Sequence, residues 1–108
     1  MATFTMKRND TSPSLVYSLL PTSVVLTGAS VVFNLRAASG SRALKVNRVP
    51  AVVVTATGAP AVRYDWRAGD TDTSGRYLFE FEVTYSGGTV ETFRNDASDE
   101  VIIVDDLG

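Results

Sequence analysis

The chain has 108 residues, of which 44% are hydrophobic and 20% charged, a composition typical of one globular domain whose core needs no metal or disulfide support. The formal net charge is -2, and the ten basic residues are scattered from Lys7 to Arg94, so the basic patch of a nucleic-acid-binding protein is missing. The absence of Cys and His excludes disulfides, Cys/His zinc sites and the nucleophile systems of Ser-His-Asp and Cys-His enzymes.

The N-terminal sequence, MATFTMKRND, lacks the apolar segment of a secretory signal. No stretch of the sequence approaches the apolar length needed to cross a bilayer. We therefore expect a protein that is made soluble in a cytoplasm and has no membrane partner.

Turn-forming residues divide the first half of the chain into short candidate strands. These are predicted at Thr3 to Lys7, Leu15 to Leu20, Ser30 to Arg36, Leu44 to Val46 and Ala51 to Thr55. The second strand is expected to pair back on the first across the turn-rich segment between them. Pro50 has no N–H to donate, so it is expected to interrupt any central strand running from Ala43 to Thr55.

The second half contains the clearest strand pattern. From Arg76 onward, the residues at odd positions are aromatic or apolar and share one face: Tyr77, Phe79, Phe81, Val83 and Tyr85. This period of two belongs to a half-buried strand. Ser86-Gly87-Gly88 can form the tight turn of a hairpin leading to Val90 to Arg94, and Glu100 to Val104 supplies a final strand. Val62, Tyr64 and Trp66 share a face at the same spacing.

Seven to eight short strands, with turn signals about every ten residues and no amphipathic helix, predict an all-β fold. Residues 1–108 are expected to form a single antiparallel β-sandwich domain. Thr73-Ser74-Gly75-Arg76-Tyr77-Leu78-Phe79 resembles the tyrosine corner of immunoglobulin-like domains, with Phe79 where antibody domains have cysteine. The resemblance implies an Ig-like variant in which Tyr77 has a structural role.

The buried side of this predicted sandwich is expected to hold the large aromatic residues. Trp66 is a candidate core anchor, and Phe79 and Phe81 lie on the inward face of the long strand. Tyr17, Tyr64 and Tyr85 fit core faces as well. A flat, exposed arrangement of Tyr17, Tyr64, Trp66 or Tyr85 would instead favour carbohydrate binding.

The sharpest candidate for a metal site is Asp70-Thr71-Asp72-Thr73-Ser74-Gly75. It matches the first half of a calcium loop, with oxygen ligands at Asp70, Asp72 and Ser74 and glycine in sixth place. Position twelve should be glutamate but is Phe81, and a strand follows where the motif requires a helix. The same residues are typical of a solvated loop, which is the favoured interpretation, so no cofactor is expected.

Paired carboxylates offer the remaining catalytic candidate. Glu80 and Glu82 share one face of the long strand, and two such groups can hydrolyse glycosides when held across a cleft. On an amphipathic strand they more often form the solvated face. We therefore expect a protein that is not an enzyme.

Several short segments together carry a more specific resemblance. They are Tyr64-Asp65-Trp66, Gly69-Asp70-Thr71-Asp72, Gly75-Arg76-Tyr77, Glu80-Phe81-Glu82-Val83, Gly88-Thr89-Val90-Glu91-Thr92-Phe93 and Asn95-Asp96, preceded by Lys7-Arg8-Asn9-Asp10 and Leu26-Thr27-Gly28-Ala29-Ser30-Val31-Val32-Phe33. Their order and spacing resemble small structural domains of tailed bacteriophages. From about Phe4 to Val104 the chain is similar to the N-terminal domain of the baseplate upper protein family.

This resemblance implies a structural protein of the virion, made in the cytoplasm of the bacterial host. Its expected role is in assembly or as an adaptor of the tail, baseplate or neck, with other virion proteins as partners and a homo-oligomer or symmetric ring array as its form. The alternatives are a capsid decoration protein, a carbohydrate-binding module and a calcium-dependent adhesion module.

Overall fold

The computed structural model describes residues 3–39, 44–94 and 99–105. These residues form nine strands and no helix, as the all-β prediction requires. The strands are β1 (Thr3–Lys7), β2 (Leu15–Ser18), β3 (Ser30–Ala37), β4 (Leu44–Pro50), β5 (Val52–Thr55), β6 (Ala61–Tyr64), β7 (Gly75–Thr84), β8 (Val90–Phe93) and β9 (Glu100–Val104). Asn95 and Asp96, which contribute to the sequence resemblance, lie outside the described residues.

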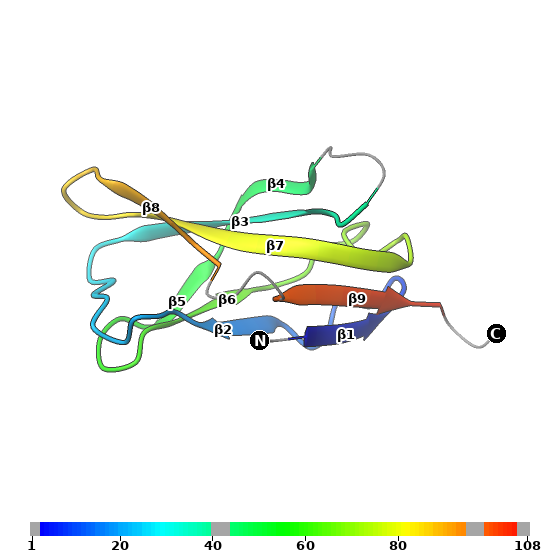
Figure 1. Ribbon diagram of the computed structural model, residues 1–108, viewed down its shortest axis with the longest axis horizontal. Coiled ribbons are helices and arrows are strands. Elements are labelled where there is room, and N and C mark those ends of the chain that lie inside the picture. The colour runs from blue at the N-terminus through cyan, green and yellow to red at the C-terminus, as the bar shows by residue number, and fades with distance from the viewer. Residues whose placement is uncertain (1–2, 40–43, 95–98, 106–108) are drawn as a thin grey trace.

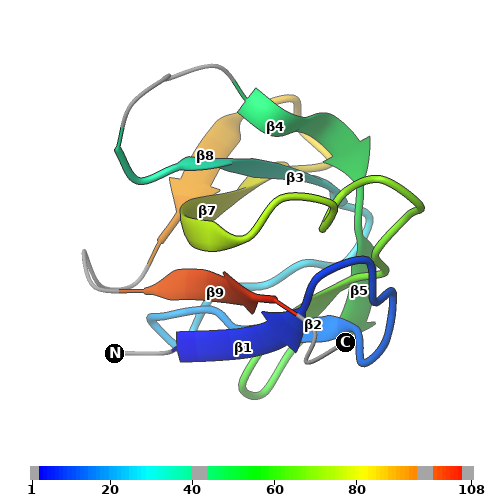
Figure 2. The same cartoon turned by 90° about the vertical axis from the view of Figure 1, so that its right-hand side faces the viewer.

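The strands form two sheets that pack together as a sandwich (Figure 1). The larger sheet has the order β1-β9-β7-β3-β4, and the smaller sheet has the order β2-β6-β5. Figure 2 shows the larger sheet stepping from β4 through β3, β7 and β9 to β1. Both β8 and β9 pair with the same long strand: β9 with Gly75 to Leu78, and β8 with Phe81 to Thr84.

The chain passes from one sheet to the other immediately after β4. Pro50 still pairs with Val32 of the larger sheet, and Ala51 N donates to Val31 O at 2.8 Å. The next residue, Val52, pairs with Arg63 of the smaller sheet. Proline is tolerated here because β4 is an edge strand, so the missing N–H breaks no central ladder. The strand consequently reaches Pro50, beyond the Leu44 to Val46 that the sequence predicts.

The pairing of β1 and β2 differs from the prediction in two respects. The second strand does not pair back on the first: β2 pairs with β6, while β1 pairs with β9. The β1–β9 pair is also parallel, the exception in an otherwise antiparallel sandwich. The turn after β1 carries the chain across to the other sheet, held by Arg8 N to Val104 O at 2.7 Å and Asn9 N to Thr71 O at 2.9 Å. Strands on either side of such a crossing cannot form a hairpin.

The core lies between the sheets and is rich in aromatic rings. Phe33 of β3 is fully buried and stacks on Tyr64 with ring centroids 4.1 Å apart. The rings of Trp66 and Phe81 lie 5.8 and 5.0 Å from the ring of Phe33. The long strand β7 has Tyr77, Phe79, Phe81 and Val83 buried in strict alternation, so the predicted inward face is confirmed for these four residues, while Tyr85 follows the strand and is half-buried.

The predicted tyrosine corner is also present. Tyr77 is buried near the start of β7, and its hydroxyl donates to the backbone oxygen of Thr73 at 2.7 Å. This bond ties the loop that enters β7 to the strand itself. The fold is therefore an Ig-like sandwich in which a phenol holds the corner and no sulfur is needed.

Candidate functional site

The aspartate-rich loop before β7 is the strongest metal candidate from the sequence. Asp70 is only 4% exposed, whereas Asp72 and Ser74 are exposed. The carboxylate of Asp70 accepts hydrogen bonds from Tyr64 OH at 2.5 Å and Arg67 N at 2.8 Å. Its other oxygen lies 3.5 Å from the Arg67 guanidinium. Asp70 therefore stabilises the loop between β6 and β7 through its contacts with Tyr64 and Arg67.

The second aspartate of this loop has different partners. Asp72 forms an ion pair with Lys45 of β4 and accepts a hydrogen bond from Thr73 Oγ1 at 3.0 Å. The hydrogen bond from Lys45, followed by that from Thr73, holds the pKa of the Asp72 carboxyl below its usual range. The structure brings no group of three or more Asp or Glu residues together among the residues that it describes. The arrangement supports the loop interpretation.

Burial and the neighbouring carboxylate both raise the pKa of the Tyr64 phenol. Desolvation has the largest effect, and the hydrogen bond to Asp70 adds to it, so the pKa of Tyr64 lies far above its usual value. A phenol held protonated in this way remains a hydrogen-bond donor at any physiological pH. Tyr64 and Asp70 therefore form a buried polar contact that stabilises the fold.

The four aromatic residues that could bind a sugar ring do not form an exposed platform. Tyr17, Tyr64 and Trp66 are buried in the core. Tyr85 is half-buried at the end of β7, and its hydroxyl donates to Glu91 at 2.7 Å across the hairpin. The core placement expected for Tyr17, Tyr64 and Trp66 is confirmed.

The two glutamates of β7 are half-buried and each has its own polar partner. Glu82 lies 2.5 Å from the Arg48 guanidinium of β4. Glu80 accepts a long hydrogen bond of 3.5 Å from the side-chain amide of Asn34 on β3. The first contact reaches from β7 across β3 to β4 and pairs Glu82 with a positive charge, whereas the second joins the neighbouring strands β7 and β3 through a neutral amide.

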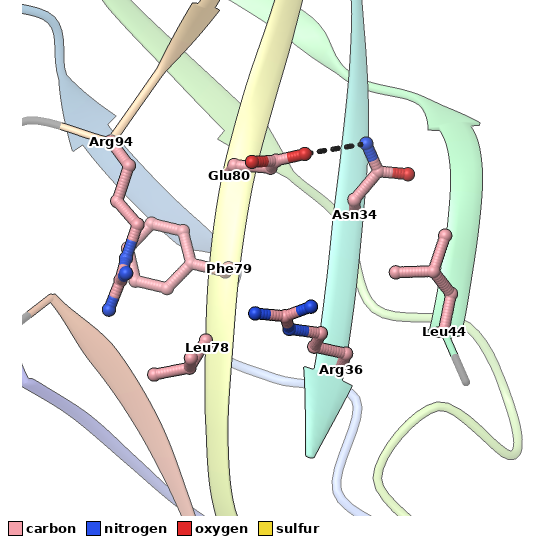
Figure 3. Close-up of a pocket in the computed structure, with 7 residues that line it drawn as sticks. All are labelled: Asn34, Arg36, Leu44, Leu78, Phe79, Glu80 and Arg94. Atoms are coloured by element: carbon pink, nitrogen blue, oxygen red, sulfur yellow. Dashed lines mark hydrogen bonds between the residues drawn. The ribbon is translucent and has the colours of Figure 1, made fainter. Parts of the chain in front are cut away.

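A small hollow opens on the outer face of the larger sheet, with a volume of about 170 Å³. Its lining residues come from β3, β4, β7 and the position directly after β8: Asn34, Arg36, Leu44, Leu78, Phe79, Glu80 and Arg94. Figure 3 shows the guanidinium groups of Arg36 and Arg94 on opposite sides of β7. These arginines were not among the site residues predicted from the sequence, although the alternation that points Asn34 outward also places Arg36 there.

The chemistry available in this hollow is limited. It is smaller than the pockets of roughly 300 Å³ or more that usually enclose small-molecule ligands. Its lining holds one carboxylate and two guanidinium groups, and guanidinium does not give up its proton in proteins. Apart from the carboxylate of Glu80, the side chains that line this hollow therefore offer no group that exchanges a proton.

The smaller sheet presents a different kind of surface. Val16 of β2 and Val52 and Val54 of β5 are exposed on its outer face. Between them lies Arg63 of β6, which forms a forked contact with Asp65 at 2.8 and 3.3 Å. This face therefore presents three exposed valine side chains around one charged contact.

Comparison with known proteins adds no identification, because no protein-family model and no curated protein matches the chain significantly. In the described part of the chain, there is no helix long and apolar enough to cross a lipid bilayer.

Proposed function

We propose that this chain is a non-enzymatic structural protein of a tailed-bacteriophage virion, acting in assembly or as an adaptor of the tail, baseplate or neck. Its partners are other virion proteins and further copies of itself in a symmetric array. The proposal joins two lines of support. The order of short sequence segments resembles phage structural domains, and the sandwich offers rigid surfaces and strand edges to neighbours.

One observation carries the non-enzymatic part of the proposal. The side chains best suited to chemistry are used inside the fold, because Asp70 is bound to Tyr64 and Arg67. Tyr17 likewise donates its hydroxyl to the buried carboxylate of Asp99. Groups held by such contacts stabilise a scaffold, which supports a structural role.

The experiment is to look for the chain in purified particles. Phage particles from a bacterial culture that carries this gene are purified by density gradient and probed with an antibody raised against the recombinant chain. We expect the chain in the particle fraction in several copies per virion, and separation of heads from tails should place it with the tails. Recovery only in the soluble fraction would contradict the virion role.

The same fractionation distinguishes the tail assignment from a capsid decoration role, for which the chain would remain with the heads. A host cytosolic protein, probed on the same blot, serves as the control for contamination. Because Tyr17, Tyr64 and Trp66 are buried, no observation in the structure favours carbohydrate binding by these rings, and we do not propose it.

A further inference from the structure

Arg36 of β3 is the side chain of the larger sheet that points to a partner. It is half-buried, and its guanidinium keeps a positive charge at any physiological pH. In the part of the chain that the structure describes, no residue forms an ion pair or a hydrogen bond with this group. The other described arginines each have an acceptor, which is a carboxylate or in one case a backbone oxygen: Arg8, Arg48, Arg63, Arg67, Arg76 and Arg94. The donors of Arg36 are therefore available to another molecule.

A leucine lies on each side of Arg36 in the sheet. Arg36 pairs with Leu44 of β4 and with Leu78 of β7, and all three side chains line the outer hollow. Leu44 is 44% exposed, so part of this apolar surface is open to a partner. Figure 3 shows the guanidinium of Arg36 directed toward β7, at a level between Leu78 and Glu80. The charge of Arg36 therefore lies among apolar side chains.

Asn34 adds a second donor to the hollow. It lies two residues before Arg36 on the same face of β3, and its side chain is only 6% exposed. Its oxygen accepts a hydrogen bond from Arg48 N at 2.8 Å. The contact of its amide nitrogen with Glu80, at 3.5 Å, is longer than a normal hydrogen bond. This amide can therefore donate to a group that enters the hollow beside Arg36.

The charge of the hollow favours an anion. Among the described lining residues, Arg36 and Arg94 are positive and Glu80 is negative, so the lining has one positive charge in excess. The chain as a whole has a net charge of -2, which makes this excess a local property. Guanidinium binds carboxylates through two parallel N–H groups, and such charge-assisted hydrogen bonds are stronger than neutral ones.

The size and lining of the hollow indicate which anion fits. A volume of about 170 Å³ is small for a free ligand and suits a single side chain. The leucines on either side of Arg36 can pack against the CH₂ groups of a glutamate or aspartate side chain. Glu80 opposes a doubly charged phosphate more strongly than a singly charged carboxylate. A carboxylate on an apolar stem therefore matches the hollow better than phosphate does.

We propose that this hollow binds the acidic side chain of a partner protein, whose carboxylate accepts hydrogen bonds from Arg36 and Asn34. Leu44 and Leu78 pack against the stem of that side chain, and Arg94 adds attraction from the other side of β7. This inference rests on the proposed assembly role, to which it adds the chemistry of one contact. A single contact of this kind is weak, and it becomes effective within a larger interface that holds the partner in place.

An NMR titration of the isotope-labelled chain with a short peptide tests this contact directly. The probe is the peptide Gly-Ser-Leu-Glu-Leu-Ser-Gly with blocked ends, and its matched control has glutamine in place of glutamate. We expect the glutamate peptide to shift the side-chain signal of Arg36, with a dissociation constant on the order of 1 mM. The glutamine peptide should bind at least about tenfold more weakly, because it carries no charge. Equal binding of the two peptides, or no shift up to about 20 mM, would overturn the proposal.

The variant Arg36→Gln removes the charge and should raise the dissociation constant of the glutamate peptide at least about tenfold. Its matched control is Arg63→Gln, which is also half-buried but lies on the smaller sheet, where Asp65 already binds the guanidinium. The control should bind the peptide like the unmodified chain, and thermal melting shows whether both variants are folded. Unchanged binding by folded Arg36→Gln would overturn the proposal. The comparison of the two peptides on the unmodified chain decides it even where Arg36→Gln does not fold.

Sodium acetate and inorganic phosphate, titrated at the same ionic strength, distinguish an acidic side chain from a free anion. Acetate has the carboxylate without the longer stem, and phosphate has more charge than the hollow can balance. Each should bind at least about tenfold more weakly than the glutamate peptide. Acetate that binds as tightly as the peptide would show that the leucines contribute nothing. Phosphate that binds as tightly would show a general anion site, and either result would overturn recognition of an acidic side chain.

The contact at Arg36 and the virion role can fail separately. A chain that is found in phage tails but does not respond to the glutamate peptide would overturn the contact and leave the virion role standing. A chain that binds the peptide through Arg36 but is absent from particles would do the reverse.

Discussion

The rings of Tyr17 and Phe79 meet edge to face, with their centroids 5.0 Å apart and their planes at 85°. Tyr17 belongs to β2 of the smaller sheet and Phe79 to β7 of the larger, so this contact joins the two layers. Antibody domains join the corresponding strands with a disulfide. In this protein an aromatic pair takes that place, which agrees with a chain that contains no cysteine.

A double-mutant cycle measures this contact. Tyr17→Leu and Phe79→Leu should each destabilise the fold, and their combined effect should fall short of the sum by about 0.5–1.5 kcal/mol, the coupling typical of aromatic pairs. Urea denaturation gives the free energies of unfolding. Tyr17→Phe removes only the hydroxyl that binds Asp99, so it should preserve the coupling to Phe79. Strictly additive effects would show that the ring contact contributes nothing beyond burial.

The tyrosine corner predicts the effect of removing one hydroxyl. Tyr77→Phe deletes the hydrogen bond to Thr73 O and should lower the free energy of unfolding by about 0.5–1.5 kcal/mol. Tyr85→Phe is the control, because the hydroxyl of Tyr85 bonds to Glu91 at the surface, where water replaces the lost partner. Equal effects for the two substitutions in urea denaturation would contradict a special role for the corner.

Phe33 is predicted to be the most costly side chain to truncate. It is fully buried and contacts the rings of Tyr64, Trp66 and Phe81. Phe33→Ala should cost about 3–5 kcal/mol, a large part of the stability of a typical domain. Thermal melting of Phe33→Ala and of Val90→Ala, which truncates an exposed side chain, checks the difference. A shift for Phe33→Ala as small as that for Val90→Ala would contradict the assignment of Phe33 to the centre of the core.

Alkaline conditions should weaken the fold because three tyrosines have raised pKa values. Burial raises the pKa of Tyr64 and of Tyr77, and burial together with Glu91 raises the pKa of Tyr85 to about 12. Below pH of about 10 both the folded and unfolded states hold these protons, so the stabilisation is complete. Above it the unfolded chain loses its protons first, and the free energy of unfolding falls until the folded-state pKa is passed.

Urea denaturation in a pH series from about 9 to about 12 measures this loss. Tyr64→Phe should reduce the steepness of the decline, since that ring no longer has a proton to lose. The absorbance of tyrosinate provides a second readout, which should rise together with unfolding. A free energy of unfolding that stays constant through this range would show that these phenols ionise equally in both states.

Calcium should leave the stability unchanged, because Asp70 and Asp72 are directed to separate protein partners. The melting temperature in calcium chloride should equal that in a chelator. A site filled at 100 times its dissociation constant would add about 2.7 kcal/mol, which differential scanning calorimetry detects easily. A melting temperature that rises with calcium concentration would contradict the structural interpretation of this loop.

The strand pattern and the corner were predictable because their information is local. The alternation from Tyr77 to Val83 specifies a half-buried strand whatever its neighbours are. The phenol at the corner reaches Thr73, only four residues away. By contrast, nothing in the residues 3–7 indicates that β1 lies parallel to β9, because that pair joins opposite ends of the chain.

The acidic loop at Asp70 likewise combines a local sequence pattern with a contact that only the fold creates. Oxygen-rich residues at alternate positions are compatible both with a cation and with a turn that is hydrogen-bonded to itself. The contact of Asp70 with Tyr64 OH favours the hydrogen-bonded turn, and it requires the fold to bury both groups. The outer hollow at Arg36 and Arg94 likewise exists only because β3 and the position directly after β8 flank the same strand, β7.

The amino-acid sequence by itself determined an all-β sandwich, the position of its long strand and the inward direction of its aromatic rings, because side-chain alternation is set by the strand backbone. Only the tertiary structure decided which strands are neighbours and how the acidic loop is bonded. These properties depend on contacts between residues far apart in the chain, where burial favours the pairing of polar groups such as Tyr64 and Asp70.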